Sequence, residues 1–386
     1  MELSKVTLEI FSKLEQKWLS HCTKEGNSKK TRILSIDGGG TTAIVAGAAL
    51  LRLEDQIRHH TSDPHAHIAD FFDVVAGTGI GAVLAAMITA SDSFGRPLYT
   101  AREAVNLVTD RNSDLYKLKT AGIFRRRRRF SSRSMDTVLK EVFTRKDDGK
   151  SLTLKDTCKP LLVPCFDLKS SAPFVFSRAD ACESPSFDFE LWKVCRATSA
   201  TPSCFKPFPL ESVDGKKSCS AVDGGLVMNN PTAAAVTHVL HNKRDFPAVN
   251  GVEDLLVLSI GNGSSSAKAR ENHEPSVIDI VLDGVSETID QMLGNAFCWN
   301  RNDYIRIQAF GLGSEGTVTE EVVEEKSEVL KERALESLPF GGKRLLTETN
   351  GNRIDSFVQR LVASGKPTPL SSPRKNSAVN PLVNGR

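Results

Sequence analysis

Short apolar runs that lead into glycine-rich turns and then into apolar helical segments recur along this chain. Residues 33–36 precede the turn Asp37-Gly38-Gly39-Gly40, and residues 43–57 continue with helical spacing. The stretch FFDVVAGTGIGAVLAA at residues 71–86 repeats this order of strand, turn and helix. Units of this kind predict an α/β fold, in which helices cover a mostly parallel sheet.

The rest of the chain alternates the same two patterns. Further strands are predicted at residues 161–168, 173–178, 208–212, 219–224, 254–260 and 303–310, and the turn VDGKK marks the third and fourth of these as a hairpin. Helices are predicted within residues 101–154 and at residues 189–201, 231–243, 319–338 and 353–364. We expect an amphipathic helix and basic linker at residues 1–30, one domain at 31–364, and a disordered proline- and serine-rich tail at 365–386.

The longest weakly polar run, residues 71–90, carries Asp73 as its only charge and is just long enough for a membrane span. The glycines in its middle instead predict a short strand and a short helix inside the domain. The N-terminal residues are charged every few positions, unlike a signal peptide, and the eight cysteines are scattered as in proteins with reduced thiols. We therefore expect a cytoplasmic protein that is at most peripheral at the plasma membrane.

The balance of 50 basic and 47 acidic residues leaves a formal charge of only +3, which gives no reason to expect a nucleic acid partner. Basic charge is nevertheless concentrated in the run FRRRRRF, which contains Arg125, Arg126, Arg127, Arg128 and Arg129. A solvated surface loop, a contact with an anionic membrane, and a nuclear-import or RNA patch all fit this run.

Three glycine-containing loops that follow strands carry the candidate chemistry. The glycines after Asp37 let backbone N–H groups approach an anion or oxyanion, and a merely tight turn explains them as well. Gly77-Thr78-Gly79-Ile80-Gly81 has the frame of a nucleophile elbow, but Gly79 at its centre carries no hydroxyl. Asp223 in AVDGGLVMNNP follows a strand, where it either acts as a general base or stabilises a turn.

The segments DGGG, GTGIG, ATSATPSCF and VDGGLVMNNP, in this order and spacing, resemble the patatin-like phospholipase family of lipid acyl hydrolases over about residues 32–310. The resemblance implies a three-layer α/β/α fold that hydrolyses phospholipid and galactolipid acyl esters through a serine–aspartate dyad, without metal or cofactor. Carried over by motif, Asp223 is the dyad aspartate and Gly79 stands at the serine position. The oxyanion loop is then Gly38, Gly39 and Gly40, and the elbow is completed by Gly77, Thr78 and Gly81.

Two departures from the family pattern bear on activity. Thr42 stands where an arginine usually follows the glycines, and Gly79 replaces the nucleophile. The glycine-centred elbow, basic run and tail resemble the plant type III subgroup of patatin-related phospholipases A, which is regarded as retaining acyl hydrolase activity. Loss of the serine removes the acyl-enzyme route, yet Asp223 could activate a water at the vacant position. A lipid-binding pseudoenzyme is the alternative. Three nearby hydroxyls are weaker substitutes for the serine: Thr78, Ser199 and Ser203.

Two further interpretations stay open. Gly77-x-Gly79-x-x-Ala82 after a strand also fits a dinucleotide-binding turn, which requires a second strand ending in an acidic residue about 20 positions on; the sequence there shows no apolar strand. A cluster of histidines fits a metal site as well as an exposed helix end and polar loop; its members are His59, His60, His65 and His67.

Overall fold

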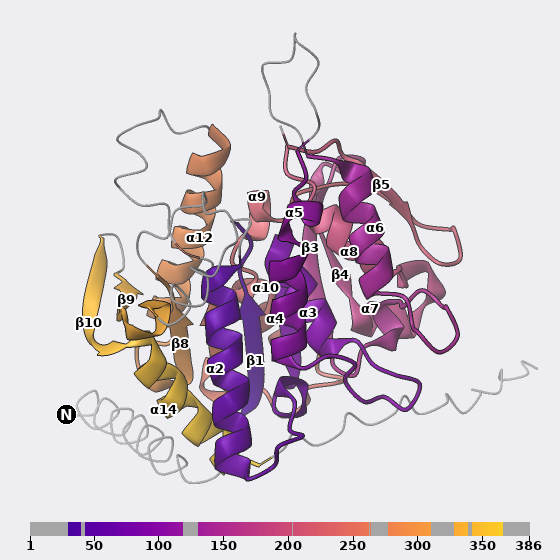
Figure 1. Cartoon of the computed structure of the whole chain (residues 1–386). Helices are drawn as coiled ribbons and strands as arrows, with labels where there is room; N and C mark the ends of the chain where they lie inside the picture. The colour runs from indigo at the N-terminus through magenta and orange to yellow at the C-terminus, as the bar shows by residue number, and fades with distance from the viewer. Residues whose placement is uncertain are drawn as a thin grey trace, which may run out of the picture.

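The structure is a computed structural model that describes residues 30–39, 43–118, 130–202, 204–261, 263, 277–309, 328–338 and 342–365. An eight-stranded sheet with the order β5-β6-β3-β2-β1-β7-β8, in which β4 also pairs with β3, forms its centre (Figure 1). The strands are β1 (Thr31–Ile36), β2 (Val74–Gly77), β3 (Leu161–Asp167), β4 (Ala172–Ser177), β5 (Phe208–Glu211), β6 (Ser218–Val222), β7 (Leu255–Ile260) and β8 (Tyr304–Ile307).

Helices cover both faces of this sheet, which confirms the three-layer α/β/α arrangement (Figure 1). The helices are α2 (Ile44–Thr61), α3 (Gly79–Thr89), α4 (Ala101–Asp110), α5 (Asn112–Leu115), α6 (Ser132–Val142), α7 (Arg178–Glu183), α8 (Leu191–Thr198), α9 (Gly225–Met228), α10 (Thr232–His241), α12 (Val277–Ala296) and α14 (Asn350–Ala363). Alternate residues of β1 point to opposite faces of the sheet. Leu34 and Ile36 pack with α2 and α3 on one face, and Ile33 packs with α10 and α12 on the other.

The three predicted loops lie at the same part of the sheet because some neighbouring strands run parallel and others antiparallel. β1 pairs in parallel with β2 and β7, so that Ile36 lies level with both Gly77 and Ile260, and the loops that follow leave the same sheet edge. β3 continues beyond the end of β2, and β6 runs back along it, with Val222 paired to Phe166. The residues that follow β6 therefore run back towards the end of β2, where the elbow begins.

Most of the predicted elements are confirmed, including the hairpin of β5 and β6 and helices α2, α3, α10 and α14. The helix predicted at residues 319–338 is wrong at its C-terminal end. There β9 (Arg333–Ser337) pairs antiparallel with β10 (Lys343–Thr349). Ala334 and Leu335 are buried in β9, and the spacing of apolar residues alone could not reveal that a distant strand would pair with this segment. Residues 319–327 lie outside the described part, as do the predicted N-terminal helix and the tail beyond residue 365.

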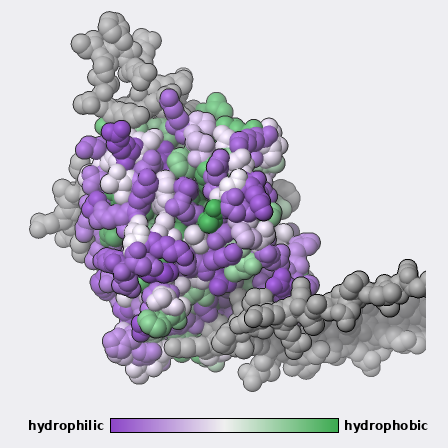
Figure 2. Space-filling model, turned by 90° about the vertical axis from the view of Figure 1, so that its right-hand side faces the viewer, coloured by the Kyte–Doolittle hydropathy of each residue, from purple (hydrophilic) through white to green (hydrophobic). Residues whose placement is uncertain are grey.

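Figure 2 shows the surface of one side of the molecule. The side that carries α6, α7 and β5 is mostly hydrophilic with small, separated hydrophobic patches (Figure 2). Within the described ranges, no helix combines the length and the apolarity that crossing a bilayer requires.

Candidate active site

The elbow forms where β2 ends. Thr78 is extended, Gly79 adopts a left-handed conformation with φ of 53°, and α3 begins there. The Thr78 hydroxyl is buried and donates to the Met228 carbonyl oxygen at 2.7 Å. Thr78 therefore links the elbow to α9 and does not stand in for the missing serine.

The two flanking positions of the elbow accept only glycine, because backbone atoms of neighbouring residues occupy the space of a Cβ. A Cβ on Gly77 would lie 2.6 Å from the Gly81 carbonyl oxygen, and one on Gly81 would lie 2.4 Å from the Asp37 carbonyl oxygen. At Gly79 the corresponding Cβ would lie 3.6 Å from Gly38 Cα, an ordinary contact. The side-chain direction at position 79 therefore points at the first glycine loop, where there is space for a side chain, although the left-handed backbone strains any residue but glycine.

The first glycine loop is fixed by neighbouring backbone. Asp37 donates its N–H to the Ile260 carbonyl at 2.8 Å, and Gly38 donates to the Asn229 carbonyl at 2.9 Å. The Gly38 N–H is thus engaged by the loop that follows Asp223. Gly39 is exposed with φ of 83°, and Gly40 lies outside the described residues.

A buried ion network holds the start of this loop. Arg306 of β8 donates two hydrogen bonds to the Asp37 carboxylate, at 2.6 and 3.0 Å, and also pairs with Asp290 of α12 at 3.1 Å. The Arg306 Nη1 group reaches Ser259 Oγ at 3.0 Å as well. Burial raises the pKa of Asp37 to about 7 and also raises that of Asp290, because one guanidinium cannot neutralise two buried carboxylates.

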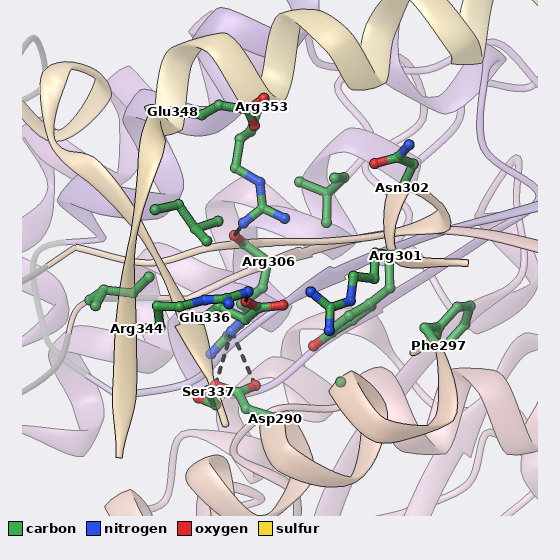
Figure 3. A pocket seen from close by; sticks show the side chains of 15 residues that line it. Asp290, Phe297, Arg301, Asn302, Arg306, Glu336, Ser337, Arg344, Glu348 and Arg353 are labelled. Carbon is green, nitrogen blue, oxygen red and sulfur yellow. Dashed lines mark hydrogen bonds and ion pairs between the residues drawn. The ribbon is translucent and has the colours of Figure 1, made fainter. Parts of the chain in front are cut away.

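Behind this network lies a pocket of about 190 Å³ between β8, the β9–β10 hairpin, α12 and α14 (Figure 3). Four arginines and three carboxylates line it: Arg301, Arg306, Arg344 and Arg353, with Asp290, Glu336 and Glu348. Arg306 is paired with Asp290 and Arg344 with Glu336, so little net charge is left in the pocket. We regard this pocket as part of the support of the first loop.

Asp223 follows β6 and is 8% exposed. Its Oδ1 accepts the Gly225 N–H at 2.8 Å, and its Oδ2 accepts the Thr201 hydroxyl at 2.6 Å. Within the described ranges, no lysine or arginine forms an ion pair with it. Burial raises the pKa of Asp223, and the two hydrogen bonds oppose that shift without cancelling it.

Two side chains tie the three loops together. Thr198 Oγ1 accepts the Gly79 N–H at 3.2 Å and donates to the Pro164 carbonyl, while the Thr198 carbonyl accepts the Gly224 N–H at 3.2 Å. The buried Asn229 Oδ1 lies 2.8 Å from the position of a Cβ on Gly38 and 3.2 Å from that of a Cβ on Gly225. The elbow, the glycine loop and the Asp223 loop therefore lie against one another.

The residues that precede and follow the undescribed arginine run lie beside this site. Leu118 and Phe130 form a β-bridge at its ends, and Phe130 packs between Tyr116 and Phe205, with ring centroids 5.5 and 5.6 Å apart. Burial and, to a smaller extent, the charge of Asp223 raise the pKa of Tyr116. Arg125 to Arg129 themselves lie outside the described residues.

Sequence reasoning missed Thr198, Thr201, Asn229 and Arg306. The first three stand inside the motifs ATSATPSCF and VDGGLVMNNP, but no pattern in the sequence says which side chain in a motif faces the carboxylate. Arg306 left a signal, because it is a charged residue inside the otherwise apolar strand YIRI.

The structure gives no catalytic contact for the other candidates among the described residues. Ser199 is 6% exposed, its hydroxyl has no hydrogen-bond partner among the described residues, and Ser203 is not described. A dinucleotide-binding fold requires a second strand that ends about 20 positions after the glycine turn. Among the described residues the next strand of the sheet after α3 is β3, which begins far later in the chain, so the dinucleotide-binding interpretation is wrong. His59 and His60 contact each other at the exposed end of α2.

Comparison with known proteins gives consistent matches. A family model described as patatin-like phospholipase matches residues 34–236. "Probable inactive patatin-like protein 9" of Arabidopsis thaliana is 68% identical, with all of both chains covered. "Patatin-like protein 7" and "Patatin-like protein 6" of the same plant are each 41% identical, over 99% and 94% of this chain and 84% and 76% of their own lengths.

Proposed function

This chain belongs to the patatin-like phospholipase family, and from that premise we propose that it cleaves lipid acyl esters slowly, with Asp223 as the general base. The observation that carries the proposal is the state of Asp223. It is a buried carboxylate of raised pKa that lies beside an elbow and accepts hydrogen bonds only from neutral donors among the described residues. A raised pKa makes a carboxylate a stronger base at neutral pH.

In this mechanism Asp223 removes a proton from a water held near position 79, and the water oxygen attacks the ester carbonyl. Oxyanion donors and substrate binding alone retain an acceleration on the order of a thousandfold over water in enzymes stripped of their catalytic side chains. A slow rate is therefore expected rather than none.

The substrates we propose are membrane phospholipids and galactolipids. A pocket of about 440 Å³ beside α9 supports a lipid substrate, because most of its lining is apolar and Met228, which accepts the Thr78 hydrogen bond, is part of it. The arginine run, anchored at Leu118 and Phe130 near the site, supports peripheral contact with an anionic membrane.

A catalytically inactive lipid-binding protein is the second candidate. Gly79 favours it, since no acyl-enzyme can form at that position. The relative from Arabidopsis thaliana that is 68% identical bears the word inactive in its name.

The test is fatty-acid release from phosphatidylcholine and galactolipid vesicles, prepared with and without anionic lipid. We expect slow release by the wild type, a loss of at least about tenfold in Asp223→Asn, and a gain of about tenfold or more in Gly79→Ser, where the added side chain has room. Asp110→Asn, at an exposed carboxylate on α4, is the matched control and should leave release unchanged. Equal release by wild type and Asp223→Asn would refute the mechanism, and binding of vesicles without release would establish the second candidate.

A further inference from the structure

A short hydrogen bond between Thr201 and Asp223 is not explained by the proposed function. The Thr201 Oγ1 to Asp223 Oδ2 distance of 2.6 Å is that of a hydroxyl donating to an ionised carboxylate. A nucleophile within hydrogen-bond reach of its base, with the base oriented by a third group, is the arrangement of hydroxyl-based covalent catalysis. Here the third group is the Gly225 N–H, which donates to Asp223 Oδ1 at 2.8 Å.

We propose that Thr201 is the nucleophile of this site and replaces the hydroxyl that is missing at position 79. The inference rests on the proposed function but changes its chemistry, because the attacking oxygen belongs to the protein and not to water. Thr201 lies in the segment after α8, three residues from Thr198, which binds the Gly79 N–H. The hydroxyl therefore belongs to the same convergence of loops as the vacant elbow.

The surrounding structure holds the Thr201 hydroxyl in place. The Ala200 carbonyl accepts the Asp223 N–H at 3.2 Å, and the Thr201 carbonyl accepts the Phe205 N–H at 2.9 Å. Phe205 in turn packs under the Arg196 guanidinium at 4.4 Å, and Arg196 is fixed by Asp136 at 2.9 Å. A reactive group supported in this way keeps its geometry when substrate binds.

Access and acid–base chemistry are both compatible with attack by Thr201. The residue is half-buried, whereas Thr78 and Thr198 are fully buried and donate to backbone carbonyls. Burial raises the pKa of Tyr116, so this phenol stays protonated at neutral pH.

The reaction is balanced as follows. The Thr201 Oγ–H proton passes to Asp223 Oδ2 while Oγ forms a bond to the ester carbonyl carbon, whose oxygen takes the π electron pair. Collapse of this intermediate breaks the bond to the alcohol oxygen, which leaves with the proton from Asp223. A water oxygen then bonds to the acyl carbon while one water proton passes to Asp223. The bond between this carbon and Oγ breaks, Oγ takes the proton back from Asp223, and the fatty acid leaves.

Two substitutions at position 201 separate attack by the threonine hydroxyl from attack by a water molecule. Thr201→Val keeps the shape and removes the hydroxyl, whereas Thr201→Ser keeps the hydroxyl and removes the hindering methyl group. We expect Thr201→Val to lose at least about tenfold in ester turnover and Thr201→Ser to equal or exceed the wild type. Thr137→Val, at an exposed threonine on α6, should change nothing, and thermal unfolding of each variant checks its fold.

Covalent labelling gives a readout that does not depend on turnover. A long-chain fluorophosphonate forms an Oγ–P bond with an activated hydroxyl and releases fluoride, and peptide mass spectrometry locates the adduct. We expect the adduct at residue 201 in the wild type and in Thr201→Ser, and none in Thr201→Val or Asp223→Asn. No adduct at this residue in the wild type, or full turnover by Thr201→Val, would overturn the inference.

The outcomes also separate this inference from the proposed function. If Thr201→Val keeps its turnover and Asp223→Asn loses it, Asp223 activates water and Thr201 is not the nucleophile. If Asp223→Asn keeps its turnover, the role of Asp223 fails, and both the proposed function and this inference fail with it.

Discussion

At the scale of single residues, two buried carboxylates of different kinds define the site. Asp223 receives hydrogen bonds from Thr201 and Gly225 and forms no ion pair with a lysine or arginine among the described residues. Asp37 is instead held by Arg306, which it shares with Asp290. The first carboxylate is the general base that we propose, and the second fixes the backbone of the glycine loop.

The stability of the protein should depend on pH through Asp37. Its pKa is near 3.9 in an unfolded chain and is raised to about 7 by burial, so the folded state binds the proton more tightly. The stability that this proton binding contributes is complete below about pH 3.9 and is lost as the pH rises to about 7. The free energy of unfolding of the wild type minus that of Asp37→Asn should therefore decrease from about pH 5 to about pH 8. Urea denaturation at the two pH values measures it, and a difference that grows with pH would contradict this assignment.

At the scale of elements, the sequence located the strands and turns of the site but not the contacts that join them. Gly79 and Asp223 could be predicted because each stands in a turn directly after a strand, which local patterns reveal. The contacts of Thr198 and Arg306 depend on how segments over a hundred residues apart pack, and no local pattern encodes that. The same reason explains the error at β9, and α12 was not predicted at all, since β-branched residues and Gly284 interrupt its helical signal.

The elbow should tolerate no side chain at its flanks. Gly81→Ala would place a Cβ 2.4 Å from the Asp37 carbonyl oxygen, where neither backbone can give way, and should cost about 3 kcal/mol of stability. Gly284→Ala is the matched control, because this exposed glycine of α12 has open space around it and should stabilise the protein by up to about 1 kcal/mol. Thermal unfolding of both variants measures the contrast, and equal midpoints would show that the close approach at Gly81 is wrong.

At the scale of the whole molecule, Arg306 joins parts of the fold that are distant in sequence. It connects β8 to the turn after β1 and to α12, and its backbone carbonyl accepts a hydrogen bond from Arg353 of α14 at 3.1 Å. The first glycine loop and the loop that follows Asp223 both depend on this connection. Asn229, whose carbonyl accepts the Gly38 N–H, precedes Asn230, which donates to Asp290.

Removal of this cation should destabilise the protein strongly. In Arg306→Leu the carboxylates of Asp37 and Asp290 would be buried without a cation, a loss of about 3–5 kcal/mol. Arg96→Leu, which removes an exposed ion pair with Asp92, is the control and should cost about 1 kcal/mol or less. Chemical denaturation of the two variants tests this, and a similar small loss in both would mean that the buried network contributes little.

The place of β1 in the sheet has a consequence for biosynthesis. It emerges from the ribosome before any other strand of the sheet, yet one of its two neighbours, β7, lies more than two hundred residues later in the chain. At the usual pace of translation this strand waits on the order of ten to forty seconds with one edge open. Nascent chains that end before β7 should therefore be clients of chaperones and prone to aggregate, whatever the catalytic fate of the finished protein.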